Sequence, residues 1–458
     1  MILHSTSRRA TQARETPVRV LLTGANGGYG RTLLDQLRRL DDMVATQLVD
    51  PDVAGTTRML DELGVPADRV ATPSTVAETT AALAAGQVAV IADGAAVDWS
   101  AADVLVEATG RIEAGHGYAD TALDHGVHVV MVSKEIESVA GVALSAKARA
   151  AGLRYLPGDG DQPANLLRLV AWVLDCGFDI VALGKSSEYD LAFDPATGVV
   201  DQAGTTVDAP GLTDLLELGD RPLETVEARA AQVASLERSA AADHCEMTVV
   251  SLYTGAHADV EGMHYPVARP HELADLYATR EDGGLIGRTG SVDVFSMLRL
   301  PGEASFAGGV FVVVRTGDPV TWETLRGKGH VVSRDGRYAC IYWPYHFMGV
   351  ETPLTIAAAV DGGSSVAEPR QHTVLAARSS SALAAGTTFR VEGHHHEIAG
   401  VAPVIVDPDD HGVAPYYLLS GARLVADVAP GELVRLDDLA DVPAAALAAY
   451  RTGLALGA

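Results

Sequence analysis

The sequence predicts an α/β protein in which a doubly wound parallel sheet precedes an α+β domain and a small β-rich domain. Three observations support this fold class. Residues 17–156 alternate between short apolar, β-branched runs and amphipathic segments, the pattern of buried parallel strands and their crossover helices. Strongly β-prone runs recur at 178–184, 308–314 and 338–343. From residue 367 onward, short strands alternate with glycine and proline turns.

Composition and charge exclude several classes of protein. The chain has 458 residues, enough for two or three domains, and a formal net charge of −26. This charge argues against a nucleic-acid partner, which would need clusters of Lys and Arg. No apolar run approaches the roughly 18 residues needed to cross a bilayer, so no membrane association is expected. Residues 1–16 are polar, lack the apolar segment of a signal peptide, and are expected to be a disordered tail.

The cysteines indicate the compartment. Cys176, Cys245 and Cys340 lie far apart in the sequence and form no C-x-x-C pair. This spacing implies neither a disulfide framework nor a structural zinc site. We therefore expect a cytoplasmic protein.

The first predicted strand, Val18–Thr23, leads directly into a glycine-rich turn and an amphipathic helix that extends to about Leu40. Glycines let backbone N–H groups approach a pyrophosphate, and the following helix N-terminus adds partial positive charge. The glycine spacing is looser than the strict G-x-G-x-x-G. We interpret the turn as a nucleotide-binding βα turn, whose candidate residues are Gly24, Asn26, Gly27, Gly28, Tyr29 and Gly30.

The second apolar run, 46–49, ends in Asp50. A carboxylate at this place can accept both ribose hydroxyls of NAD and repels the 2′-phosphate of NADP. NAD is therefore favoured over NADP. The alternative is a glycine turn without a ligand and a solvated aspartate before Pro51.

Two later strands bring polar groups to the same edge of the sheet. The run 104–106 ends in Glu107, Ala108, Thr109 and Gly110, and the run 127–132 ends in Ser133 and Lys134. Because the carboxyl ends of parallel strands meet at one edge, these groups are expected near the cofactor.

The loop 157–163 opens another predicted helix. Asp161 stands where an N-cap is wanted, and Pro163 suits the first helical turn. Asp161 and Gln162 at a helix mouth beside a cofactor can hold a polar substrate. The alternative for Asp159 and Asp161 is helix capping alone.

The strand expected at 178–184 is followed by the densest cluster of reactive side chains in the chain, at 184–190. It includes Lys185, Glu188 and Tyr189. A buried lysine can polarise a carbonyl or shuttle a proton, because burial lowers its pKa. Glu188 and Asp190 are candidates to hold a divalent cation, so a metal requirement stays open. The alternative is a solvated polar loop.

Several of these segments together resemble homoserine dehydrogenase. The chain is more closely similar to homoserine-dehydrogenase-like oxidoreductases that bear a C-terminal SAF domain, a family that includes the 1-deoxy-D-xylulose 5-phosphate reductoisomerase-like enzymes. The segments that carry the resemblance are 23–30, 106–110, 126–134, 160–163, 184–185, 342–346 and 349–351.

The resemblance implies an N-terminal Rossmann domain. It places the glycine turn at the pyrophosphate, Asp50 at the adenosine ribose and residues 107–110 on the nicotinamide side. Lys134 takes the place of the lysine that ends the matching strand in homoserine dehydrogenases. Lys185 is our first choice for the proton-handling residue. A homodimer or homotetramer, with the second sheet at the dimer contact, is also implied.

One departure from the family concerns the substrate. The reductoisomerase-like members carry Asp-Gly-Thr-Lys shortly before a Glu-Met pair, whereas Glu246 and Met247 here follow Ala240–Cys245. Two groups that could hold a phosphate or polyol are thereby lost, which argues against reductoisomerase activity. His244 and Glu246 are candidate replacements. The alternative is that both are ordinary residues of a helix expected within 217–250.

Two further stretches carry histidines. Tyr345 and His346 follow the strand at 338–343 and are expected to line the active site, with His346 as an acid or base or as a structurally bonded histidine. Residues 394–397 read His-His-His-Glu. Adjacent side chains of an extended segment point to opposite faces, so a surface loop is expected there rather than a metal site.

The sequence thus predicts an NAD(P)-dependent oxidoreductase that acts on a CH–OH group of a small polar hydroxy or oxo compound, such as a sugar phosphate, sugar acid or semialdehyde. One alternative is a 1-deoxy-D-xylulose 5-phosphate reductoisomerase-like enzyme of isoprenoid-precursor synthesis, and another is a non-catalytic nucleotide-binding sensor or scaffold. The catalytic candidates are Lys185, Lys134, Glu188 and Asp161, and the substrate-binding candidates are Gln162, Tyr189, His244, Glu246, Tyr345 and His346.

The expected organisation has five parts. They are a tail (1–16), a Rossmann domain (17–156), a substrate, catalytic and dimerisation domain (157–366), a SAF-like β-clip domain (367–445) and a C-terminal tail (446–458).

Overall fold

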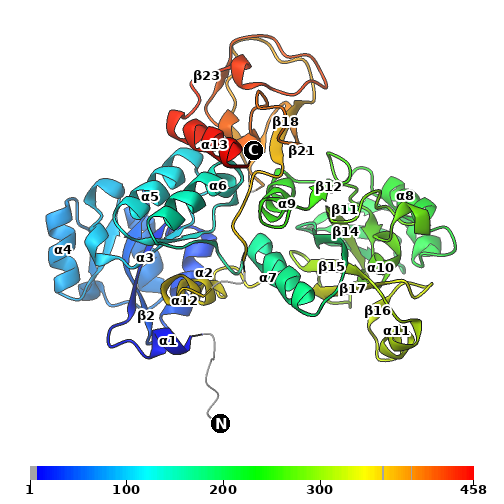
Figure 1. The fold of residues 1–458 in the computed structure, drawn as a ribbon, viewed down its shortest axis with the longest axis horizontal. Coiled ribbons are helices and arrows are strands. Elements are labelled where there is room, and N and C mark those ends of the chain that lie inside the picture. Colours follow the sequence, from blue (N-terminus) through cyan, green and yellow to red (C-terminus); the bar gives the residue numbers. More distant parts are fainter. Residues whose placement is uncertain (1–7, 364–365, 394, 458) are drawn as a thin grey trace.

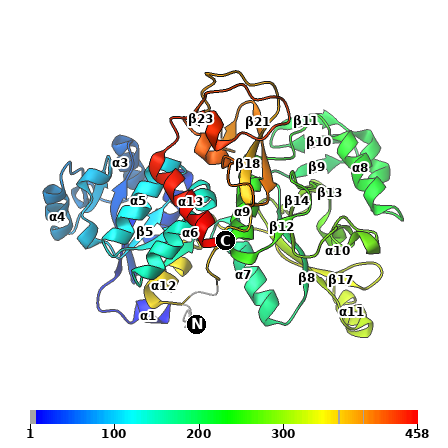
Figure 2. The same ribbon diagram turned by 45° about the horizontal axis from the view of Figure 1, so that its top comes forward.

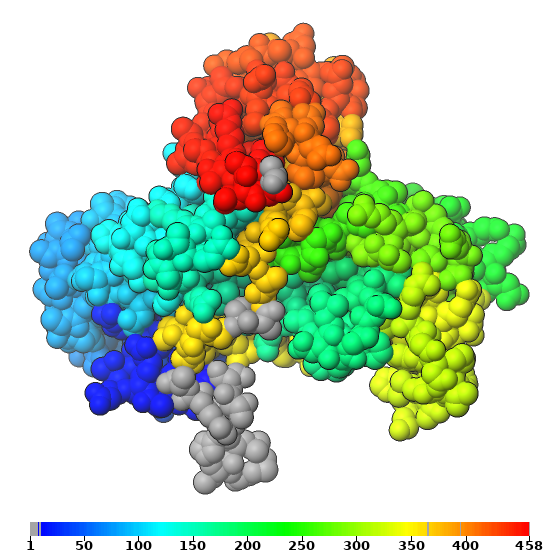
Figure 3. Space-filling model, in the orientation of Figure 1, coloured from blue at the N-terminus to red at the C-terminus, as the bar shows by residue number. Residues whose placement is uncertain are grey.

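A computed structural model describes residues 8–363, 366–393 and 395–457. Figure 1 shows a first sheet domain, mainly in blue and cyan, beside a second sheet domain in green and yellow. The C-terminal residues, in orange and red, lie across the top of both. Figure 3 shows the same arrangement as a continuous surface, with the C-terminal part seated against each of the other two.

The first sheet is parallel throughout and has the strand order β3-β4-β2-β1-β5-β6-β7. The order reverses beside β1, so a crevice forms there at the carboxyl ends of the strands, as in doubly wound folds. The strands are β1 (Val18–Thr23), β2 (Met43–Val49), β3 (Val70–Ala71), β4 (Val88–Ile91), β5 (Val104–Glu107), β6 (His128–Met131) and β7 (Tyr155–Pro157). The helices are α2 (Gly28–Leu37), α3 (Val53–Glu62), α4 (Val76–Ala84), α5 (Ile112–Asp124) and α6 (Lys134–Ala150).

Two glycines of the β1–α2 turn are required by the backbone. Gly24 has φ of +68°, and a Cβ there would lie 2.3 Å from the carbonyl oxygen of Ala108. A Cβ on Gly30 would lie 2.3 Å from the carbonyl oxygen of Ala25. The sequence spacing of these glycines therefore reflects close backbone contact between the turn, the β5 loop and the start of α2.

The second sheet is mixed, with the order β11-β10-β9-β14-β8-β15-β17-β16 and with β12 and β13 also paired to β14. The three runs expected to share a sheet do so, because β15 pairs antiparallel with both β8 and β17. The strands are β8 (Ile180–Ser186), β9 (Leu191–Asp194), β10 (Val199–Gln202), β11 (Thr205–Asp208), β12 (His257–Ala258), β13 (Val267–Ala268), β14 (Ser291–Arg299), β15 (Val310–Arg315), β16 (Val331–Val332) and β17 (Tyr338–Trp343).

The helices of this domain are α7 (Gln162–Asp175), α8 (Pro222–Gln232), α9 (Ala241–Thr254), α10 (Leu273–Leu276) and α11 (Pro319–Arg326). The helical stretch expected over 217–250 is thus two helices, separated by non-helical residues 233–240. This break matters for the site, because α9 starts at the interdomain cleft and is buried along its whole length.

One helix crosses the expected domain boundary. Residues 157–366 were expected to form the second domain, but α12 (Thr352–Asp361) packs into the core of the first. Its Ile356 and Ala357 lie in the same buried cluster as Leu22 of β1 and Val130 of β6. The chain therefore returns to the Rossmann-like domain before entering the C-terminal domain.

The C-terminal region consists of small two-stranded sheets and a final helix. The strand pairs are β18 (Val374–Ser379) with β21 (Val401–Val406), β19 (Val391–Glu392) with β20 (Glu397–Ile398), and β22 (Arg423–Leu424) with β23 (Leu439–Ala440). The short strands and turns expected from residue 367 are therefore present. The SAF assignment itself stays a prediction.

Both expected tails contain a helix in the part of the chain that the structure describes. Residues 9–12 form α1 (Arg9–Gln12), and the buried Thr11 hydroxyl donates to Asp42 at 2.7 Å. The C-terminal stretch is α13 (Ala444–Gly457), whose Tyr450 and Leu454 are buried. Figure 2 shows α13 lying along α6 of the first domain, which explains why an Ala- and Leu-rich terminus is helical here.

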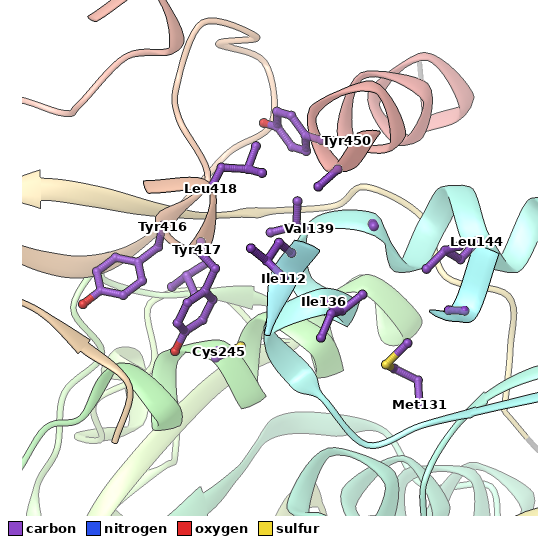
Figure 4. Close-up of a cluster of buried hydrophobic side chains, with 14 of the residues drawn as sticks. Ile112, Met131, Ile136, Val139, Leu144, Cys245, Tyr416, Tyr417, Leu418 and Tyr450 are labelled. Carbon is purple, nitrogen blue, oxygen red and sulfur yellow. The ribbon is translucent and has the colours of Figure 1, made fainter. Parts of the chain in front are cut away.

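A single apolar cluster joins the three parts of the molecule. Figure 4 shows it between α5, α6, α9 and the turn at 416–419. Its members include Ile112, Ile136, Val139, Cys245, Tyr416, Tyr417, Leu418 and Tyr450. Because one contiguous core spans the elements, their relative positions are fixed by packing. Among the described residues, no helix is long and apolar enough to span a membrane.

Candidate active site

The candidate site is a cavity of about 280 Å³ where the carboxyl ends of β5 and β6 face α7, α9 and the C-terminal domain. All three parts of the chain contribute to its wall. The lining residues are Tyr29, Ala108, Thr109, Gly110, Val132, Ser133, Lys134, Glu135, Asp161, Gln162, Glu188, Ala242, His346, Met348 and His396.

The glycine turn is arranged for an anionic ligand. Gly27 is the N-cap of α2, and its lack of a side chain leaves the first N–H groups of the helix without a side-chain cap. Such N–H groups, together with the helix dipole, form a binding place for a pyrophosphate. Gly28 lies on the open side of the turn, where a Cβ would meet only the end of the Met348 side chain, at 3.6 Å.

Asp50 follows β2 and is bound to the same turn. Its Oδ2 accepts the Asn26 amide N–H at 3.0 Å, and its Oδ1 accepts the Asp52 amide N–H at 2.9 Å. Asn26 also donates from Nδ2 to Asp52 at 3.1 Å. The carboxylate therefore shapes the turn as well as presenting charge beside it. Contact of Asp50 with a ribose stays a prediction.

Glu107 has a different role from the one expected. The residue is fully buried, and its Oε1 accepts both the amide N–H of Thr109 at 3.0 Å and the Thr109 hydroxyl at 2.5 Å. Burial raises the pKa of its carboxyl, and hydrogen bonds from Ser133 and Thr109 oppose that rise. Glu107 holds the turn from beneath, whereas Ala108, Thr109 and Gly110 line the cavity.

Tyr29 connects the glycine turn to α12 and to the loop that precedes α7. Its hydroxyl lies 2.6 Å from the Thr352 hydroxyl and 3.1 Å from the carbonyl oxygen of Asp159. These contacts join α2 to α12 and to the loop that opens α7. Burial raises the pKa of the phenol, so Tyr29 acts as a neutral hydrogen-bonding group.

Four charged side chains form a continuous row of ion pairs that runs from the cavity wall into the protein interior. Lys134, at the start of α6, lies 2.6 Å from Oε1 of Glu246 on α9. The other oxygen of Glu246 pairs with Lys185 of β8, whose Nζ is also 2.7 Å from Asp243 Oδ1. Asp243 and Glu246 are three residues apart and so lie on one face of α9. Tyr265 donates to Asp243 at 3.2 Å and completes the row.

The side chains of Lys134 and Lys185 differ in their exposure to the cavity. The side chain of Lys185 is 0% exposed, whereas that of Lys134 is 20% exposed and lines the cavity. Our first choice for the proton-handling residue was Lys185. In the structure it lies behind Glu246, so Lys134 is the ammonium that faces the cavity.

Pairing between the lysines and the carboxylates keeps Lys134, Lys185 and Glu246 in their charged forms. Burial acts to lower the pKa of Lys185, but Asp243 and Glu246 outweigh burial and raise it. The sequence predicts a lowered pKa for Lys185, and this net direction is wrong because the neighbouring carboxylates outweigh the effect of burial. Burial likewise acts to raise the pKa of Glu246, but Lys134 and Lys185 lower it to about 2. The pKa of Lys134 is raised well above its ordinary value by Glu246 and Asp161 despite burial.

Asp161 lines the cavity beside these charged residues, and the pKa of its carboxyl lies near neutrality. It stands at the N-cap of α7, as expected, but its side chain makes no capping hydrogen bond and lines the cavity instead. Burial raises the pKa of its carboxyl to about 7. Lys134 opposes this rise, while the negative charges of Glu246 and Glu135 add to it. Gln162 lies beside it on the cavity wall.

The polar cluster after β8 divides between two places. Glu188 lines the cavity and lies 3.2 Å from Nδ1 of His395. Asp190 instead pairs with Arg299 at 2.7 Å, so the two carboxylates do not converge on a cation. Among the described residues, no group of three or more His, Cys, Asp or Glu side chains is placed to hold a metal ion. Tyr189 is 39% exposed and packs edge-on against His395.

Two other expected substrate residues lie away from the cavity. Tyr345 is 55% exposed and packs against Phe347 outside it. His244 points from α9 toward Tyr265, with ring centroids 5.8 Å apart, and burial lowers its pKa. His346 does line the cavity, with Nδ1 3.1 Å from the carbonyl oxygen of Gly308. Burial lowers the pKa of His346.

His395 and His396 are partly buried, whereas Glu397 is exposed. His394 lies outside the described residues, but His395 contacts Glu188 and His396 contacts Glu135, with Nδ1 2.5 Å from Oε1. His396 has φ of +54°, and this turn lets adjacent side chains reach different domains. Glu397 accepts the amide N–H of Ala241, the first residue of α9, at 2.8 Å. The sequence showed the composition of this segment, but its contacts depend on the packing of the C-terminal domain.

Comparison with known proteins identifies the domains. Residues 27–157 match the family model described as the NAD-binding domain of homoserine dehydrogenase. Residues 160–352 match the model described as oxidoreductase DRL, catalytic domain.

Two curated relatives are 1-deoxy-D-xylulose 5-phosphate reductoisomerases of Rhodopseudomonas palustris. The one from strain BisB5 is 32% identical over 155 residues, which is 32% of this chain and 37% of the relative. The one from strain TIE-1 is 30% identical over 163 residues, which is 34% of this chain and 40% of the relative. The match thus spans well under half the length of either relative.

Solved structures with partial likeness include an oxidoreductase from Agrobacterium radiobacter in complex with NAD⁺, L-tartaric acid and magnesium. It is 14% identical, covers 48% of this chain and 55% of that chain, and has a TM-score of 0.28. Another is a probable dehydrogenase from Thermotoga maritima. It is 12% identical, covers 76% of this chain and 90% of that chain, and has a TM-score of 0.36.

The two family-model matches indicate the class of each domain: residues 27–157 are similar to an NAD-binding domain, and residues 160–352 are similar to the catalytic domain of an oxidoreductase. The chain combines an NAD-binding domain of homoserine dehydrogenase type with a catalytic domain of DRL type. The resemblance stated from the sequence is thereby confirmed for these two domains.

Proposed function

We propose that the protein reduces or oxidises a small polar hydroxy or oxo compound in the cavity beside Lys134, with NAD(P) as the redox partner. A bound nicotinamide would supply or accept the hydride. The observation that carries the proposal is the position of Lys134. The ammonium follows β6 at the edge where the glycine turn lies, and it faces the cavity while Glu246 holds it from behind.

Lys134 and Asp161 have different roles in the proposed reaction. An ammonium has three donors, and Lys134 gives one of them to Glu246. The others can bind a substrate oxygen and stabilise negative charge that develops on it. Because its pKa is raised, Lys134 stays charged and is a poor proton donor. Asp161, with a carboxyl pKa near 7, is suited to give a proton to that oxygen or to take one from it.

The experiment that tests the proposal is a calorimetric titration of NADH and NADPH into wild type and Asp50→Ala. We expect NADH to bind more tightly than NADPH, and we expect Asp50→Ala to remove most of that preference. Asp61→Ala, which removes another acidic side chain of the neighbouring helix α3, is the matched control. An absorbance screen of sugars, sugar acids, sugar phosphates and semialdehydes follows with the preferred cofactor.

The outcomes of this titration separate the functional classes. Failure of both nucleotides to bind would overturn the oxidoreductase proposal. Tight nucleotide binding without turnover of any substrate class would favour a nucleotide-binding sensor. A reductoisomerase-like function is the second candidate, favoured by the 32% and 30% identical segments of the curated relatives. Turnover of 1-deoxy-D-xylulose 5-phosphate in the screen would support it.

We propose further that the protein is a cytoplasmic homo-oligomer. Cys176, Cys245 and Cys340 are free, which fits a reducing compartment. On α7, Trp172 is 52% exposed and Leu174 is 56% exposed, which favours a subunit contact on that helix. Light scattering of wild type and Trp172→Glu tests this proposal, and an unchanged monomeric mass in both would contradict it.

A further inference from the structure

A second cavity adjoins the candidate active site. It has a volume of about 400 Å³ and lies around the break between α8 and α9. Both cavities are lined by Glu188, and they flank the first turn of α9 from Ala240 to Asp243. His395 and Glu397 of the C-terminal domain form part of its wall.

The wall of the second cavity is rich in uncharged hydrogen-bonding groups. Ser187, Thr205, Ser235 and Ser239 contribute hydroxyls, Tyr189 a phenol and Gln202 an amide. Tyr189 is 39% exposed, so a molecule in the cavity can reach its hydroxyl. Hydroxyls of this kind donate and accept, and they match the hydroxyls of a polyol without requiring charge.

The charged groups of the two cavities are mostly acidic. The carboxyls are Glu135, Asp161, Glu188, Glu237, Asp243 and Glu397. The cationic side chains are Lys134, held by Glu246, and Arg238, which donates to the carbonyl oxygen of Tyr265 at 2.8 Å. A phosphate ester needs several cations or free N–H groups around it, and acidic neighbours repel it.

The N-terminus of α9 is a second position that could bind a phosphate, but a carboxylate of the protein already binds there. The N-terminus of α9 opens onto the second cavity, and a free helix N-terminus is a ready anion site. Here the carboxylate of Glu397 accepts the amide N–H of Ala241 at 2.8 Å. The C-terminal domain thus places a carboxylate at this helix N-terminus, where its negative charge disfavours a phosphate.

We propose that the two cavities together form one substrate site for an unphosphorylated polyhydroxy carbonyl compound. The reacting carbon lies in the cavity beside Lys134, and the hydroxyl-bearing remainder extends past Glu188 into the second cavity. This inference rests on the proposed oxidoreductase function and names its substrate class. It separates this chain from enzymes whose substrate is a sugar phosphate.

The test compares ligands that share a five-carbon chain and differ in one terminal group, which is neutral, a carboxylate or a phosphate. The pentitols xylitol, ribitol and D-arabinitol, with the corresponding aldonates and 5-phosphates, are titrated by calorimetry into the protein with and without NADH. Alcohols cannot be reduced by NADH, so binding is measured without turnover. We expect a neutral pentitol to bind at least about tenfold more tightly than its phosphate, with the aldonate between them.

Variants identify the cause of the preference. Glu188→Gln is expected to narrow the difference between neutral and phosphorylated ligands, because it removes charge shared by both cavities. The matched control, Glu224→Gln on the exposed side of α8, is expected to leave that difference unchanged. A phosphate that binds as tightly as its neutral partner, or the binding of no ligand in the series, would overturn the inference.

This design keeps the two proposals distinguishable. Absence of nucleotide binding refutes the oxidoreductase function, while pentitol binding to the protein alone still reports on the cavity. Nucleotide binding with a preference for phosphates would retain the oxidoreductase function and refute the substrate class.

Discussion

At the scale of single residues, the main result is the unequal exposure of two lysines. Lys134 faces the cavity, and Lys185 has no exposed surface, yet both bind Glu246. Substitution of one should therefore affect chemistry, and substitution of the other should affect folding.

For Lys134→Met we expect turnover to fall by about 10²–10⁴-fold with little change in cofactor affinity, because a group that stabilises the substrate oxygen is lost. For Lys185→Met we expect the free energy of unfolding to fall by about 3–5 kcal/mol, because the buried carboxylates of Asp243 and Glu246 lose their ion-pair partner. Steady-state kinetics and urea unfolding measure the two effects. Equal loss of stability in both variants would contradict this division.

Asp161 should set the pH dependence of the reductive direction. Its carboxyl pKa is near 7, and the protonated form is the donor, so the rate should fall as pH rises through about 7. Asp161→Asn should be slow at all pH values and should lack this fall. The measurement is a pH profile of kcat/KM between pH 5 and 9. A wild-type rate that rises across this range would refute the assignment.

At the scale of the elements, α6 and α9 are joined by a buried carboxyl. Glu137 of α6 accepts hydrogen bonds from Tyr155 and, at 2.7 Å, from Tyr253 of α9. Burial raises the pKa of Glu137 from 4.5 to about 7, although both phenols act to lower it. The folded state therefore holds this proton more tightly than the unfolded chain does.

The stabilisation linked to Glu137 has a defined pH window. The stabilisation is complete below about pH 4.5 and is lost as pH rises through about 7. The free energy of unfolding should fall by about 3 kcal/mol between these two pH values as a result. Glu137→Gln should therefore weaken the decline in stability between pH 5 and 8. Urea unfolding across that range measures it, with the exposed Glu281→Gln as control. An identical decline in wild type and Glu137→Gln would show that this carboxyl is ionised when folded.

At the scale of the whole molecule, one buried apolar cluster contains residues of all three domains. Leu418 and Tyr450 of the C-terminal region lie in the same buried cluster as Val139 of α6 and Cys245 of α9. The loop at 395–397 adds polar contacts to both other domains above the cleft. The C-terminal domain thus lines the two cavities as well as contributing to the buried cluster.

This shared cluster predicts cooperative unfolding of the full chain. Leu418→Ala should lower the free energy of unfolding by about 2–5 kcal/mol and should shift a single transition. Leu456→Ala, at a side-chain position of α13 that is 53% exposed, should have little effect. Circular dichroism during urea unfolding measures both. Separate transitions, of which only one moves in Leu418→Ala, would contradict this prediction.

The sequence by itself determined the elements that have a local signature. The glycine turn at 24–30, the strands of the first sheet other than β3 (Val70–Ala71), and the position of Asp161 at a helix start all follow from patterns within a few residues. Lys134, Lys185 and Glu246 were also identifiable as candidates by their places after strands or in a motif. These features are local because backbone conformation and hydrophobic periodicity depend on near neighbours in the chain.

Only the tertiary structure decided how those residues act. Lys185 and Glu246 are 61 residues apart and Glu135 and His396 are 261 apart, so no local pattern relates them. The pKa of a buried lysine depends on which carboxylates pack against it, and here Asp243 and Glu246 reverse the expected direction. The sequence predicts a surface loop at 394–397, and the packing of the C-terminal domain places His395 and His396 in the walls of the two cavities. The reason is physical: burial and charge pairing are set by long-range contacts that form only when the three domains pack together.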